Sequence, residues 1–140
     1  MCPCCQQWAP IQQSVIDGLE RYRTALGQPV HILSGFRCPK HNAEVGGAPF
    51  SRHMMGLAVD HELRDGDRTI WRAALVAIRF FYRVIIYPNR FLHVDQDDSA
   101  GFGVVFVTVK IGNKSEYWPL HRFLRDTTAG ILLDGIFGKF

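Results

Sequence analysis

No stretch of the 140-residue chain approaches the roughly 20 consecutive apolar residues that a membrane-spanning helix needs. The N-terminus also lacks a basic start followed by an apolar core, so we expect no signal peptide and synthesis in the cytoplasm. Lysine and arginine are scattered rather than striped, and the net charge is only +3, which argues against nucleic acid as a partner. Repeats and linkers are missing too, so the sequence predicts one domain over residues 1–140.

Cysteine is scarce, and the four cysteines are Cys2, Cys4, Cys5 and Cys38, three of them crowded at the extreme N-terminus. Three interpretations stay open. The thiols could be free, as is the default in a cytosolic chain. They could bind a second, structural metal ion through four thiolates, or form one disulfide. A thioredoxin-like redox role is not indicated, because no strand precedes the C-x-x-C pattern.

The chain does contain a motif at residues 51–60, SRHMMGLAVD, in which a histidine and an aspartate stand seven positions apart. Imidazole and carboxylate groups are both good zinc ligands. Residues 57–63 are predicted to form a strand, on which Ala58 and Asp60 point the same way. Asp60 can then face a site with room beside it, and His53 can fold back over that face.

A catalytic zinc site needs three protein ligands and an open position, so a third ligand has to come from elsewhere in the chain. Residues 91–95, FLHVD, alternate in polarity and place Phe91, His93 and Asp95 on one face of a strand. His93 is therefore the expected third ligand. Asp95 shares its face, where it can either take a proton during catalysis or orient His93 through a hydrogen bond.

These residues form the pattern Ser-x-His-x-x-Gly-x-Ala-x-Asp, followed at a distance by His-x-Asp. The pattern resembles the zinc D-alanyl-D-alanine carboxypeptidases and L-alanyl-D-glutamate endopeptidases of bacteria and phages. The upstream segments SGFRCPKHN, at residues 34–42, and VGGAP, at residues 45–49, resemble the same family. The resemblance covers about residues 30–95 and is not visible after residue 97. The joint motif is specific, because several residue types must coincide at set spacings.

The resemblance implies that His53, Asp60 and His93 bind one catalytic Zn²⁺ ion. It also implies that Arg37 steadies the negative charge that builds on the substrate. Ser51, which opens the motif, is expected to support these ligands without binding the metal itself.

The expected general base is less clear from the resemblance. Many family members carry a carboxylate three residues before the last histidine, or a histidine two residues before it. Arg90 and Phe91 stand at those positions here, and neither can act as a base. Asp95 is therefore the expected catalytic base, with the orientation of His93 as its rival role.

The expected fold is α+β, a central antiparallel sheet flanked by two main helices as in hedgehog and DD-peptidase domains, with zinc on one sheet face. Apolar periodicity predicts helices over residues 11–26 and 67–82, the second capped by Asp67. Strands are expected over residues 30–33, 57–63, 83–87, 91–95 and 102–111. Residues 118–124 are expected to form a short helix. Residues 35–52 are expected to form a long functional loop, and the tail 130–140 to dock on the core or a partner.

Two functions remain open at this stage. The first is a zinc metallopeptidase, of D,D-carboxypeptidase or L,D-endopeptidase type, that cleaves peptidoglycan stem peptides at the cell wall if it is released or exported, as phage endolysins do. The second is a non-catalytic, zinc-containing binding domain of the same fold, a role that hedgehog domains illustrate. No oligomeric state is indicated by the sequence.

Overall fold

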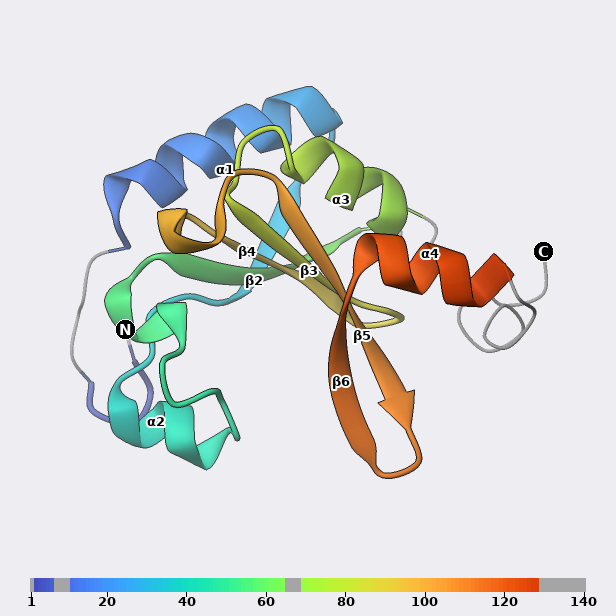
Figure 1. Cartoon of the computed structure of the whole chain (residues 1–140). Coiled ribbons are helices and arrows are strands. Elements are labelled where there is room, and N and C mark those ends of the chain that lie inside the picture. The colour runs from blue at the N-terminus through green and yellow to red at the C-terminus, as the bar shows by residue number, and fades with distance from the viewer. Residues whose placement is uncertain (1, 7–10, 65–68, 129–140) are drawn as a thin grey trace.

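The computed structural model describes residues 2–6, 11–64 and 69–128 (Figure 1). Its centre is a six-stranded sheet with the order β1-β2-β4-β3-β5-β6. The strands are β1 (Val30–Ser34), β2 (Ala58–Leu63), β3 (Arg83–Tyr87), β4 (Phe91–Asp95), β5 (Val104–Ile111) and β6 (Lys114–Pro119). The helices are α1 (Gln13–Leu26), α2 (Pro39–Glu44), α3 (Ile70–Ala77) and α4 (Leu120–Thr128), with 3-10 turns η1 (Arg52–Met55) and η3 (Asp98–Ala100). Within these described residues, no helix combines the length and hydropathy needed to cross a membrane.

The α+β class is confirmed, but the expectation of an antiparallel sheet is wrong at one pairing, because β3 and β5 run parallel. The reason lies in which strand edges are already occupied. β4 is paired on one side with β2 and on the other with β3, so the next strand has to join an outer strand, and it pairs with the adjacent β3. Asp95 ends β4 beside Arg83, where β3 begins, and β5 enters with Val104 next to that same residue.

One face of the sheet is buried beneath helices and forms the hydrophobic core. Figure 1 shows α1 and α3 lying along this side, with α2 on the opposite side of the sheet. The strands contribute every second side chain to the core, as expected for a sheet covered on one face. These buried residues are Val59, Val84, Ile86, Leu92, Val94, Val107 and Val109. The alternate side chains therefore lie on the other, open face.

The C-terminal elements differ from expectation in one respect. Trp118 lies in β6 opposite Val107, so the helix expected over residues 118–124 begins two residues later, at Leu120. The indole ring of Trp118 is buried against the core, which favours a position in a strand over one in the first turn of a surface helix. α4 then packs beside α3, where Phe123 stacks on Trp71 at a centroid distance of 5.4 Å. The expected tail docking and the Asp67 cap lie outside the described residues.

The segment between β1 and β2 is more ordered than its lack of periodicity predicted. It contains α2, a helix of six residues, which is too short to leave a periodic signal in the sequence. Asn42 lies buried at its centre and donates through Nδ2 to the Ala48 carbonyl at 2.8 Å. A Cβ atom at Gly47 would lie 2.1 Å from the Asn42 Oδ1, so only glycine allows this close packing.

The core contains one buried polar pair, Tyr22 on α1 and His61 on β2. The Tyr22 hydroxyl and the His61 Nε2 are 3.0 Å apart, and both side chains have no exposed surface. Burial lowers the pKa of His61 from 6.5 to about 4, although the nearby Asp60 carboxylate partly opposes the shift. As predicted from strand alternation, His61 points away from the face that carries Asp60.

The buried His61 predicts a specific dependence of stability on pH. Since its pKa is lower in the folded state, the unfolded chain takes up the proton first as the pH falls. Stability from this group is complete above about pH 6.5 and declines by about 3 kcal/mol as the pH approaches 4. Urea denaturation of the wild type and of His61→Phe at pH 7 and pH 4.5 measures how much stability each protein loses between the two pH values. The variant should lack the part of the loss that comes from His61. Equal pH losses in the two proteins would contradict the prediction.

Candidate metal centre

Two of the expected ligands are brought together by the register of the sheet. Asp60 on β2 stands directly opposite His93 on β4, and both side chains lie on the open face. Side chains directly opposite each other on neighbouring strands are close enough to share a ligand. The next pair along, Ala58 and Asp95, also faces this side, and the small alanine leaves room beside the aspartates.

The third ligand, His53, is delivered by the 3-10 turn η1. The Ser51 Oγ accepts the His53 N–H at 3.4 Å at the start of the turn. Gly56 ends the turn in a left-handed conformation, with φ of 68°, which glycine adopts without strain. The backbone N–H of Arg37 donates to the His53 carbonyl at 3.2 Å. His53 is thus fixed over the sheet with 1% of its surface exposed.

Three ligand atoms converge at this point: His53 Nε2, Asp60 Oδ1 and His93 Nδ1. The two imidazole nitrogens lie 3.2 Å apart, and they lie 3.2 Å and 2.9 Å from the carboxylate oxygen. A tetrahedral zinc site with bonds of about 2.0–2.1 Å has neighbouring ligand atoms about 3.3 Å apart. The three atoms therefore have the mutual spacing of zinc ligands.

The other nitrogen of each imidazole fixes the tautomer. His53 Nδ1 lies 2.7 Å from the Gly35 carbonyl, which can only accept, so this nitrogen carries the proton. His93 Nε2 lies 2.8 Å from Asp95 Oδ2 and donates to it in the same way. In the neutral imidazoles, both inward nitrogens are then lone-pair acceptors. Three acceptors facing one another repel unless a cation lies between them.

The electrostatics of the cluster agree with a site for positive charge. Burial acts to raise the pKa of Asp60, but the neighbouring imidazoles of His53 and His93 outweigh it and hold the pKa well below its usual range. Burial acts to lower the pKa of His93, but the carboxylates of Asp60 and Asp95 outweigh it, and the pKa is raised. A proton and a metal ion therefore compete for the His93 Nδ1.

Arg37 lies beside the three ligands. Its terminal guanidinium nitrogen is 3.7 Å from Asp60 Oδ2, and the side chain is only 12% exposed. Its Nε is buried without a hydrogen-bond partner among the described residues. A buried donor of a charged group without a partner is costly, unless a bound molecule supplies the acceptor.

Asp95 is fully buried and engaged on both oxygens. Oδ2 accepts from Arg83 Nε at 2.7 Å and from His93 Nε2 at 2.8 Å, while Oδ1 accepts from the Asp97 backbone N–H at 3.2 Å. Arg83 was not expected from the sequence to contribute to the site. It begins β3 directly opposite Asp95, so the signal exists only once the strand pairing is known.

Aromatic side chains on the open face were also not expected to line the site. Tyr87 stacks on Phe91 with ring centroids 4.3 Å apart, and its hydroxyl lies 3.2 Å from that of Tyr117. Burial raises the pKa of Tyr87, as does the neighbouring Tyr117; the charge of Asp60 adds a smaller rise, and the charge of Arg37 opposes it. Tyr87 is therefore within electrostatic reach of the ligand cluster and stays protonated.

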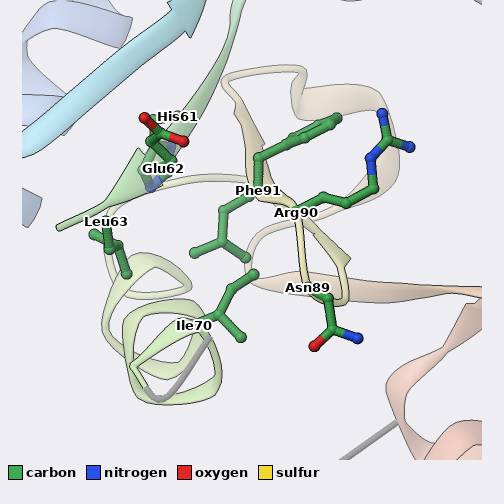
Figure 2. Close-up of a pocket in the computed structure, with 8 residues that line it drawn as sticks. His61, Glu62, Leu63, Ile70, Asn89, Arg90 and Phe91 are labelled. Atoms are coloured by element: carbon green, nitrogen blue, oxygen red, sulfur yellow. The ribbon is translucent and has the colours of Figure 1, made fainter. Parts of the chain in front are cut away.

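A separate pocket lies apart from the group formed by His53, Asp60 and His93. Figure 2 shows Ile70, Asn89, Arg90 and Phe91 among the residues around this pocket, whose volume is about 250 Å³. None of the three convergent ligands lines it. It therefore does not define the metal centre, which lies on the open face of the sheet instead.

Comparison with known proteins identifies the family. A family model described as Peptidase M15 matches residues 3–95, which is well over half of the chain. The chain belongs to the M15 peptidase family. A search of curated proteins found no significant match.

The matched range of the M15 peptidase includes His53, Asp60 and His93, the group that could hold a metal ion, together with Arg37 and Asp95. The metal-binding arrangement and the peptidase family therefore coincide in one part of the chain. The segment after residue 95 lies outside the match, and it supplies β5, β6 and α4. These elements extend the sheet beyond β3 and cover part of its core face.

Replacing His53 by alanine should remove most of the bound metal, since two protein ligands hold zinc poorly. Elemental analysis after zinc loading and desalting measures the effect. His31→Ala is the matched control, because His31 is exposed and contacts Glu62 rather than the ligands. A full metal complement in His53→Ala, equal to that of His31→Ala, would rule out His53 as a ligand.

Proposed function

We propose that this M15 peptidase is a zinc-dependent enzyme that hydrolyses peptide bonds in peptidoglycan stem peptides. The observation that carries the proposal is the convergence of His53 Nε2, Asp60 Oδ1 and His93 Nδ1 as three acceptors on an open sheet face. The substrate class follows from the resemblance of the motif to the D-alanyl-D-alanine carboxypeptidases and L-alanyl-D-glutamate endopeptidases. Such an enzyme would act at the cell wall after release or export.

His53, Asp60 and His93 are the proposed zinc ligands. Zinc held by these three residues would supply Lewis-acid polarisation of a substrate carbonyl group and would lower the pKa of a bound water molecule. The protein contributes rigidity to this chemistry. The Gly35 carbonyl and the Asp95 carboxylate each hold one imidazole by its outer N–H, so both inward nitrogens point to the same place.

Arg37 is the proposed binding group for negative charge on the substrate. Asp60 anchors its guanidinium from one side, and the Nε has no partner among the described residues. A planar guanidinium donates several hydrogen bonds in one plane, which suits a carboxylate or a developing oxyanion. Tyr87 and Phe91, on the same face, supply an aromatic wall beside this donor.

For Asp95, the geometry supports the orienting role more than that of the base. Its side chain has no exposed surface, and it accepts from Arg83, His93 and the Asp97 backbone. A general base must reach the proton that it removes, directly or through one water molecule. We therefore propose that Asp95 holds His93 in position and keeps its outer nitrogen protonated.

A second candidate function rests on one specific observation. Arg90 and Phe91 occupy the two positions at which many family members carry the base, and Asp95 is enclosed by its partners. These features favour a non-catalytic, zinc-containing domain that binds the same peptides. Hydrolysis separates the two functions directly.

The test is incubation of the zinc-loaded protein with two stem-peptide substrates, one ending in D-Ala-D-Ala and one containing the L-Ala-D-Glu bond. We expect one of the two bonds to be cleaved, as measured by mass spectrometry of the products. A chelator should abolish the cleavage, and added zinc should restore it. Zinc-dependent binding of the peptides without any product would establish the binding domain instead.

The variant Arg37→Ala tests the role of the Arg37 guanidinium in the same assay. It should retain zinc and fold but lose on the order of 10²–10³ in rate, as for the loss of an oxyanion donor. Arg37→Lys should recover only part of the rate, because lysine lacks the planar fork. Near-normal turnover by Arg37→Ala would show that this arginine does not contact the reacting group.

Asp95→Asn separates the orienting role from that of the base. Asparagine keeps the shape, but it cannot accept the proton or hold the charge of His93 and Arg83 as a carboxylate does. We expect zinc affinity to fall by about 10–100-fold, with activity restored by excess zinc. The measurement is a titration of activity against added zinc. Normal zinc affinity with no activity at saturating zinc would identify Asp95 as the base.

A further inference from the structure

A second group of metal-ligating side chains lies near α2, apart from the histidines. The sulfur atoms of Cys2, Cys5 and Cys38 all lie within 4.8 Å of one another. Cys2 and Cys38 are 1% and 7% exposed, and Cys5 is half-buried. A tetrahedral zinc site with Zn–S bonds of about 2.3 Å has sulfurs about 3.8 Å apart, so a small contraction would complete such a site.

The N-terminal turn is shaped to present two of these sulfurs together. Gln6 donates its backbone N–H to the Cys2 carbonyl at 2.9 Å and adopts a left-handed conformation, with φ of 55°. A non-glycine residue rarely adopts this conformation. The turn therefore holds an unfavourable backbone geometry that brings Cys2 and Cys5 to the same side.

Cys38 meets this turn from a distant part of the chain. It precedes α2, and its sulfur accepts the backbone N–H of His41 at 3.4 Å. The backbone amides of Cys38, Cys5 and Cys4 lower the pKa of the Cys2 thiol, with that of Cys38 the largest cause and burial opposing it. Amide donors stabilise negative charge on sulfur, and the thiolate is the form that binds metal.

The fourth cysteine is also close. Burial raises the pKa of the Cys4 thiol and the neighbouring Cys38 adds to the rise, although Cys4 is not among the three cysteines whose sulfurs converge within 4.8 Å. None of the four forms a disulfide in the structure. The three convergent thiols come from one turn, which holds Cys2 and Cys5, and from Cys38, and thiolates from such a group can supply three of the four donors of a structural zinc site.

We propose that Cys2, Cys5 and Cys38 bind a second metal ion, a structural zinc held by thiolates, with Cys4 in the same turn as the candidate fourth ligand. The site ties the N-terminal turn to the segment that carries Arg37, which directly precedes Cys38. It would therefore fix the backbone that places the guanidinium beside Asp60. The proposal does not depend on peptidase activity.

The first test is the zinc content of the full chain after zinc loading and desalting. We expect about two zinc ions per chain in the unaltered protein and about one in Cys38→Ser. Because Cys38 precedes α2, its replacement can also disturb the fold. Cys5→Ser, in the N-terminal turn, is therefore the second variant and should also retain about one ion. His53→Ala should lose the other ion and keep this one.

Cobalt substitution assigns each ion to its site. Thiolate-to-cobalt charge transfer gives a near-ultraviolet absorption that nitrogen and oxygen ligands do not produce. This absorption should persist in His53→Ala and should be largely lost in Cys38→Ser and Cys5→Ser. A negative result at the cysteines is thus distinguishable from a failure of the histidine site.

Two results would overturn the proposal. One is an unchanged zinc content in both cysteine variants, together with no thiolate-to-cobalt absorption from the unaltered chain. The other is a thiol titration of the unfolded, chelator-treated chain that finds about two free thiols instead of four, since that result identifies a disulfide. The proposal expects four thiols, all of which become reactive only after the chelator removes the metal.

Discussion

The convergence of three hydrogen-bond acceptors constrains the structure around the candidate metal centre. His53 Nε2, Asp60 Oδ1 and His93 Nδ1 lie 2.9–3.2 Å apart, and the outer imidazole protons are already donated to Gly35 and Asp95. Such an arrangement is unfavourable without a positive charge at its centre. A proton on His93, whose pKa is raised because the carboxylates of Asp60 and Asp95 outweigh burial, and a bound metal ion are two ways of supplying that charge.

The division of the sheet into two faces allows charged groups to converge on one face while the other face forms the hydrophobic core. The helical face buries apolar side chains together with the neutral pair Tyr22 and His61, and it supplies most of the hydrophobic stabilisation. The open face can then hold acidic and basic groups that would be costly in the core. The neighbouring residues Asp60 and His61 therefore have opposite environments: Asp60 faces the candidate metal centre, and His61 is buried in the core.

The segment between β1 and β2 connects the two candidate metal sites. Its start carries Arg37 and Cys38, and its end carries His53 in the turn η1. The backbone hydrogen bond from Arg37 to His53 joins these two ends at 3.2 Å. An ordered loop is therefore a requirement for the site, because it positions both a ligand and the donor beside it.

The sequence alone determined the residue types and spacings of the motif, the side of the strand on which each residue lies, and the α+β class. Alternation with a period of two is local, so it separates Asp60 from His61 without knowledge of neighbouring strands. Only the tertiary structure decided that Asp60 stands opposite His93, that Arg83 holds Asp95, and that β5 runs parallel to β3. These features depend on strand register and free strand edges, which join residues far apart in sequence and leave no local periodic signal.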